Sequence, residues 1–244
     1  MKPHVDLLIW GDFACFTRPE FKAERESYPC ITPSAARGLL EAIYWKPQMR
    51  YRILEIHIHR KGSRFSLLRN ELKSCQTDRG TGVFIDGGNR QQRNALILRD
   101  VVYRIIAWID IRADETGEHI GKHLSCYERR AAIGAYHHKP VLGCREFPAS
   151  FAQFGSGNIA PNLPNAPESI NESFGTMLFD TAYIPRGDEM TFYRHANRKK
   201  GIVQGSAKRL FFEANVESGI IKVPQGRYNE IDKLEGKQWV SIKH

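Results

Sequence analysis

Residues 95–112 alternate apolar and polar side chains, and this stretch most constrains the fold. Successive side chains of a β-strand point to opposite faces of a sheet, so the stretch predicts one long strand with an apolar face and a mixed face. The apolar face comprises Val101, Tyr103, Ile105, Ala107, Ile109 and Ile111, and the mixed face comprises Arg104, Ile106, Trp108 and Asp110.

Two helices are predicted from their start and stop signals. Thr32 followed by Pro33 gives an N-cap and a proline at the first helical position, which opens a helix over residues 34–44 that Pro47 stops. A second helix is expected over roughly residues 118–135. Its buried face carries Ile120, Leu124, Tyr127 and Ala131.

Further strands are predicted at residues 5–10 and 50–59, with a closing strand at 140–147. In the strand at 50–59, His57 and His59 share the face expected to meet solvent or RNA. The order strand–helix–strand–strand–helix–strand is that of ferredoxin-like folds, which RNA-recognition motifs share with many unrelated proteins.

The second half of the chain differs in composition. Residues 155–167 are rich in Gly, Asn and Pro and read as a linker, and short strands follow up to residue 223. Residues 226–244 are highly charged and are expected to be ordered in part by partners. We therefore predict an α+β protein with a ferredoxin-like domain in residues 1–150 and a small antiparallel β-sheet domain in residues 151–244.

The charge balance favours a polyanionic partner. The 244 residues include 36 Lys+Arg against 27 Asp+Glu, for a net charge of +9. A solvated basic surface is the alternative. The five cysteines are scattered without a C-x-x-C pair, which argues against a disulfide framework or a zinc ribbon and fits a reducing cytoplasm. Apolar runs are too short for a signal-peptide core or a membrane span.

A candidate catalytic cluster joins the two helices. Gly121-Lys122-His123 begins the second helix, and in a ferredoxin-like unit this end can approach the end of the first helix, where Tyr44 lies. Histidine shuttles protons near neutral pH, lysine stabilises phosphorane charge, and tyrosine orients or donates. Spacing alone favours the alternative, in which Lys122 is solvated, His123 lies on the surface and Tyr44 packs in the core.

Basic residues interleaved with aromatics predict RNA contacts, because such patterns track a backbone and stack bases. The segment 186–209 is the main example, and a charged hairpin with core aromatics is an equal alternative. Residues 61–94, read as a polar, basic loop, form a second basic set. The candidate RNA-binding residues are Arg18, Arg37, Trp45, Lys46, Arg90, Arg93, Arg194, Arg198, Lys199 and Lys200.

Four blocks of sequence carry a resemblance to a known family. They span residues 11–47, 89–109, 121–130 (GKHLSCYERR) and 142–151, with a looser match at 174–185. The chain resembles the CRISPR-associated endoribonucleases of the RAMP superfamily, subtype I-C or Dvulg. The resemblance implies a ferredoxin-like domain, a small β domain, and a catalytic set of Tyr44, Lys122 and His123.

The resemblance also implies the reaction and its partners. The family cleaves precursor CRISPR RNA (pre-crRNA) at the base of the repeat hairpin without metal or cofactor, giving a 2′,3′-cyclic phosphate and a 5′-hydroxyl. The enzyme stays on the 5′ handle of the mature crRNA as a Cascade subunit, beside the backbone and large subunits. The alternatives are a non-catalytic handle-binding subunit and a general duplex binder, including of DNA.

Overall fold

The computed structural model describes residues 5–21, 23–73, 88–113, 119–156, 162–196 and 199–241. Within these residues no helix is long and apolar enough to cross a bilayer. The helices are α1 (Pro33–Ile43), α2 (Ile120–Ala132) and α3 (Gly226–Glu235). The strands are β1 (Val5–Ala14), β2 (Met49–Arg60), β3 (Ser63–Leu72), β4 (Arg90–Arg112), β5 (Ser150–Gln153), β6 (Glu172–Ile184), β7 (Met190–Ala196), β8 (Lys199–Glu217), β9 (Ile220–Lys222) and β10 (Trp239–Ser241).

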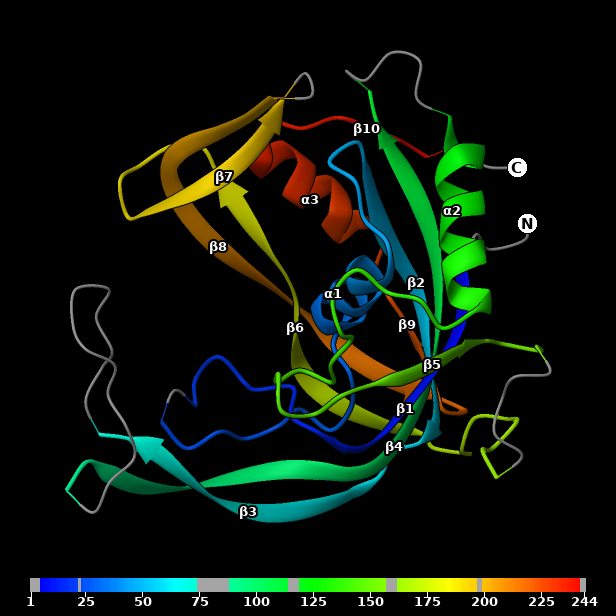
Figure 1. The fold of residues 1–244 in the computed structure, drawn as a ribbon, viewed down its shortest axis with the longest axis vertical. Coiled ribbons are helices and arrows are strands. Elements are labelled where there is room, and N and C mark those ends of the chain that lie inside the picture. Colours follow the sequence, from blue (N-terminus) through cyan, green and yellow to red (C-terminus); the bar gives the residue numbers. More distant parts are fainter. Residues whose placement is uncertain are drawn as a thin grey trace.

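The described strands pair into one antiparallel sheet, which makes the protein α+β as predicted. The strand order is β5–β1–β4–β2–β9–β8–β6, and β3 and β10 pair with β4 while β7 pairs with β8 (Figure 1). Because β9 pairs with β2, strands from the second half of the chain extend the sheet that the first half begins. The predicted short strands of the second half correspond to β6–β9.

β4 confirms the long strand predicted from alternation. It pairs with β1 on one side and with β2 on the other, so it lies at the centre of this part of the sheet. Its apolar face from Val101 to Ile109 is fully buried at alternate positions. Burying such a row of side chains is the main stabilising contribution of the core.

α1 begins with the predicted cap. The Thr32 hydroxyl accepts a hydrogen bond from the Ala35 amide at 3.1 Å, and Pro33 occupies the first turn. The helix buries Leu39, Leu40 and Ile43. α1 contacts β2 and β6, α2 contacts β4 and β5, and the two helices also contact each other. Their mutual contact positions the candidate cluster.

The prediction of a polar loop over residues 61–94 is wrong where the structure describes it. β3 pairs with residues 90–99 of β4 in a two-stranded ribbon that extends away from the body of the molecule (Figure 1). Most side chains of β3 are exposed or half-buried. Phe65 and Leu67 form a half-buried face, but exposed Leu68 on the other face breaks the apolar alternation, so periodicity did not reveal the strand. Residues 74–87 lie outside the described part.

Two other expectations need correction. Residues 140–147 do not form a strand, and β5 pairs with β1 in the place expected for the closing strand. The charged C-terminal segment contains α3 and β10, with Tyr228 and Ile231 of α3 buried. Because this segment is rich in charged residues, the helical spacing of its few buried side chains was not recognised.

His59 does not face solvent or RNA, contrary to the prediction. The chain after β5 covers its side chain, which packs against Phe154 with 5.7 Å between the ring centres and is 1% exposed. Its Nδ1–H donates to the Pro164 carbonyl at 2.8 Å. Its Nε2 has no hydrogen-bond partner among the described residues. His57 is half-buried and its Nε2 lies 2.8 Å from a Glu55 carboxylate oxygen.

His59 makes stability depend on pH. Burial lowers the pKa of His59 from 6.5, so between the lowered value and pH 6.5 the unfolded state binds more protons. The stability that neutral His59 contributes is complete above pH 6.5 and is lost as the pH falls. We expect His59→Asn, which keeps a donor toward Pro164, to lose less stability than wild type between pH 7 and pH 5. Urea unfolding at both pH values measures this, and equal losses contradict it.

Candidate active site

Tyr44 is held at the end of α1 by its own backbone. Its φ of −153° and ψ of 128° turn the chain out of the helix, while its amide still donates to the Leu40 carbonyl at 3.1 Å. The Tyr44 carbonyl accepts a hydrogen bond from the Tyr51 hydroxyl of β2 at 2.7 Å. Burial holds the pKa of Tyr51 well above its usual value, so this hydroxyl remains a donor. Tyr44 is therefore tied to the sheet.

His123 reaches Tyr44 from the first part of α2. The Tyr44 hydroxyl and His123 Nδ1 are 3.1 Å apart, within hydrogen-bond distance. Both side chains are buried, with 4% of Tyr44 and 1% of His123 exposed. The structure thus brings together two of the three predicted catalytic residues, from positions 79 residues apart.

This pair is suited to moving protons. When His123 Nδ1 is unprotonated it accepts from the phenol, and when Nδ1 is protonated it donates to the phenol oxygen. Histidine changes its charge near neutral pH, whereas a phenol has an ordinary pKa of about 10. His123 is the natural acid or base of the pair, and Tyr44 is the group that fixes its ring.

Lys122 lies beside this pair on the surface. It precedes His123 in the first turn of α2, its side chain is exposed, and its amide donates to the His119 carbonyl at 3.1 Å. The start of a helix carries partial positive charge from its free amides. A lysine there adds a full charge, so this end of α2 suits a phosphate.

Arg130 supports Tyr44 and was not among the predicted site residues. The Arg130 Nη1 donates to the Ile43 carbonyl at 2.8 Å, and its Cζ lies 5.4 Å from the centre of the Tyr44 ring. Arg130 is two helical turns after His123, so both lie on the same face of α2. That spacing was the available signal, and it required knowing which face of α2 meets α1.

Trp45 and Lys46 follow Tyr44 directly and border a basic groove. Trp45 is 40% exposed, and Lys46 is also exposed. The opposite wall comes from the segment after α2, whose backbone is held at α1 because the His137 and His138 amides donate to the Ala42 carbonyl. The groove is lined further by Lys139, Val141 and Arg145.

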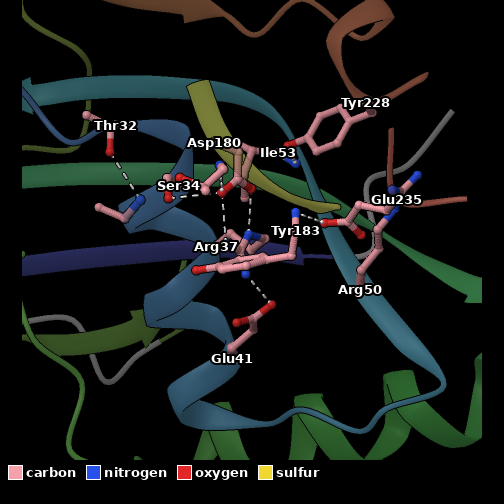
Figure 2. Close-up of polar contacts among 12 residues, drawn as sticks. Thr32, Ser34, Arg37, Glu41, Arg50, Ile53, Asp180, Tyr183, Tyr228 and Glu235 are labelled. Carbon is pink, nitrogen blue, oxygen red and sulfur yellow. Dashed lines mark hydrogen bonds and ion pairs between the residues drawn. The ribbon is translucent and has the colours of Figure 1, made fainter. Parts of the chain in front are cut away.

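Arg37 is held by carboxylates. Its Nε donates to Asp180 at 2.7 Å and its Nη1 to Glu41 at 2.7 Å, as Figure 2 shows. Ser34 also donates to Asp180, at 3.1 Å. These bonds join α1 to β6. In the described structure the Arg37 guanidinium therefore binds the protein itself.

The remaining candidate RNA-binding residues are scattered. Arg18 stacks on the Tyr28 ring, with its Cζ 4.6 Å from the ring centre. Arg194 donates to the Glu235 carbonyl at 3.1 Å. On the ribbon, Arg93 pairs with Glu71, and Arg90 is exposed; Lys199 and Lys200 begin β8, and Arg198 lies outside the described residues. The structure does not bring these residues together at the Tyr44–His123 pair.

Metal-binding side chains do not cluster in the described part of the chain. Among those residues, no group of three or more His, Cys, Asp or Glu side chains is placed to hold a metal ion. The candidate site is therefore assigned from its phenol, imidazole and ammonium groups.

Fold and site together define a class of protein. The family model described as CRISPR-associated protein (Cas_Cas5) matches residues 5–224 of this antiparallel α+β chain. The chain belongs to this CRISPR-associated family, in its Cas5d branch. The resemblance found in the sequence is thereby confirmed.

Two relatives share most of their length with the chain, and both are named CRISPR pre-crRNA endoribonuclease Cas5d. The protein of Thermus thermophilus is 45% identical over 230 residues, which cover 93% of this chain and 94% of the relative. The protein of Mannheimia succiniciproducens is 34% identical over 246 residues, covering 96% of this chain and 100% of the relative.

Two solved structures share the fold. One is a crystal structure of a CRISPR-associated protein, with a TM-score of 0.58, 20% identity, and coverage of 90% of this chain and 91% of that one. The other is a functionally uncharacterized protein from Streptococcus mutans, with a TM-score of 0.59, 22% identity, and coverage of 91% and 93%. At these identities the likeness concerns the fold alone.

Proposed function

We propose that this chain is a metal-independent endoribonuclease that cleaves pre-crRNA at the base of the repeat hairpin. The observation that carries the proposal is the contact of 3.1 Å between the Tyr44 hydroxyl and His123 Nδ1, with Lys122 beside it. The names of two relatives that match nearly the whole chain supply the substrate class.

The chemistry uses the nucleophile that RNA carries. The 2′-oxygen attacks the adjacent phosphorus, the bond from phosphorus to the 5′-oxygen breaks, and the products are a 2′,3′-cyclic phosphate and a 5′-hydroxyl. His123 takes the proton of the 2′-hydroxyl or gives one to the leaving oxygen. Lys122 stabilises the charge that develops on the phosphorane. Tyr44 positions the imidazole and assists the 2′-hydroxyl.

Cleavage in EDTA tests the proposal against its main alternative. Purified protein is incubated with its repeat RNA in excess EDTA, and the ends of both fragments are analysed. We expect cleavage with a cyclic phosphate upstream and a 5′-hydroxyl downstream. Tight binding of the hairpin without cleavage favours the second candidate, a non-catalytic subunit that binds the 5′ handle. Steeply salt-dependent binding of any duplex, including DNA, favours a general binder.

Lys122→Ala is expected to reduce cleavage about 10²–10³-fold, as for loss of one group that stabilises an oxyanion. The variant is expected to keep its affinity for the hairpin, because it loses a single exposed cation and the rest of the basic surface remains. Single-turnover rates and gel-shift affinities measure the two effects. Lys222→Ala, an exposed lysine on β9, is the matched control. Wild-type cleavage by Lys122→Ala removes this residue from the mechanism.

The proposal extends to partners and place of action. The basic composition and the family support a product that remains bound as the crRNA 5′ handle, within a cytoplasmic Cascade complex beside backbone and large subunits. The order β5–β1–β4–β2, with α1 and α2 between its strands in the chain, supports a ferredoxin-like unit. The division into residues 1–150 and 151–244 stays a prediction, and β5 spans the boundary.

A further inference from the structure

A cavity of about 300 Å³ lies between α1, β6, β7 and α3, and it shares Trp45 with the lining of the basic groove. Six aromatic side chains line it, namely Trp45, Tyr51, Tyr183, Tyr193, Tyr228 and Trp239. Tyr183 is 42% exposed and Tyr193 is 62% exposed, so these rings offer faces to a ligand. Ligand sites commonly measure about 300–1,000 Å³, so this cavity admits a single base and excludes a duplex.

Five cations and three carboxylates line the cavity, and several of these charges are paired. Arg37 is paired with Asp180 and Glu41, and Glu235 accepts the Tyr183 amide and pairs with Lys237 (Figure 2). Paired cations attract a phosphate weakly, because their charge is already neutralised. Aromatic faces beside carboxylates and guanidinium groups suit a neutral, planar ring with polar edges.

Glu41 offers a group that can read the edge of such a ring. Its Oε1 accepts from Arg37, and within the described residues no hydrogen bond to its Oε2 is recorded. The side chain is 26% exposed and lines both the cavity and the basic groove. Carboxylate oxygens accept hydrogen bonds from the amino groups of nucleobases. The cavity therefore favours a base with an exocyclic amino group.

The neighbouring groove supplies further positive charge. Lys46, Lys139 and Arg145 line it, and Glu41 is the acidic side chain of its lining. Trp45 and Pro47 border both spaces. A strand whose phosphates follow the groove passes Trp45, where one base can turn into the cavity. Tyr44 directly precedes Trp45 in the chain, so the cavity and the candidate catalytic pair lie at the same end of α1.

We propose that this cavity holds one unstacked nucleobase of the repeat RNA, beside the scissile linkage. The inference rests on the proposed function and adds a site that positions the RNA on the protein for cleavage. Base–aromatic stacking explains the exposed rings, and removal of one ring is expected to weaken binding about 5- to 150-fold.

Fluorescent RNA tests the inference. 2-Aminopurine, which carries an amino group, replaces each unpaired nucleotide near the scissile linkage in turn, and a 2′-deoxy scissile nucleotide prevents cleavage. We expect one position to be quenched on binding to the wild type, and Tyr193→Ala and Tyr183→Ala to restore its fluorescence. The matched control is Ile202→Ala, which removes the exposed side chain that pairs with Tyr193 across β7 and β8 and does not line the cavity.

The outcomes test the inference separately from the proposed function. Quenching at one position that both tyrosine variants abolish supports the cavity, whether or not the ribose form of the RNA is cut. Cleavage of that RNA without such a position overturns the inference and leaves the function intact. Quenching that survives both variants, or that Ile202→Ala abolishes equally, also overturns it. If the wild type neither binds nor cleaves the RNA, both the inference and the proposed function are overturned.

Discussion

His123→Ala is expected to cleave the repeat hairpin about 10²–10⁴-fold more slowly than wild type, which is the range for loss of a general acid or base. Histidine is the side chain best suited to acid or base catalysis near neutral pH, and the His123 ring lies with its Nδ1 3.1 Å from the Tyr44 hydroxyl. Single-turnover cleavage rates measure the effect, and gel-shift assays show whether the hairpin still binds.

The control for this variant is His57→Ala. His57 lies in β2 and contacts Glu55, so its loss removes a histidine without touching Tyr44. We expect this control to cut at the wild-type rate and His123→Ala to keep wild-type affinity for the hairpin. Equal cleavage by His123→Ala and wild type assigns the proton transfer to another group. Loss of binding together with cleavage assigns His123 a structural role.

Asp110→Ala is expected to destabilise the protein by about 3–5 kcal/mol, because it leaves Arg52 without its carboxylate partner and removes one of the two carboxylates that hold Arg50. Asp110 is fully buried, and it accepts hydrogen bonds from Arg50 Nε at 3.0 Å and Arg52 Nε at 2.8 Å. Arg50 lies directly opposite Asp110 across β2 and β4. It also pairs with Asp232 of α3, so the cluster joins α3 to the sheet.

Urea unfolding measures the loss as a lower midpoint at an unchanged slope. The matched control is Glu230→Ala, which removes a carboxylate that is 38% exposed and pairs with Arg227 within α3. An exposed pair of this kind contributes about 0–1 kcal/mol. A loss for Asp110→Ala no larger than that of the control contradicts the view that buried Asp110 stabilises the fold through Arg50 and Arg52.

The parts of the fold that sequence could predict depend on local signals. β4 alternates over its core length, and Thr32 with Pro33 marks the start of α1 within a few residues. β3 was missed because its side chains are mostly exposed or half-buried. Its pairing with β4, rather than its composition, defines it as a strand. β5 is four residues long, and its pairing with β1 was likewise not visible in its own sequence.

The candidate site shows the same division. The order of helices and strands allows the end of α1 to approach the start of α2, and the family resemblance selected Tyr44 and His123 as the pair that meets there. Their burial, and the contact of Arg130 with the Tyr44 ring, depend on how the helices face each other. Arg37 was predicted to bind RNA, and its pairing with Asp180, 143 residues away, could not be read from neighbouring residues.

Replacement of the scissile ribose by 2′-deoxyribose tests the central claim most directly. If Tyr44, Lys122 and His123 act by letting the ribose attack its own phosphate, the wild type binds the deoxy substrate and leaves it uncut. The all-ribose hairpin is then cut with a 2′,3′-cyclic phosphate under the same conditions. Cleavage of the deoxy substrate at the same linkage would contradict the account, because the attacking group would come from elsewhere.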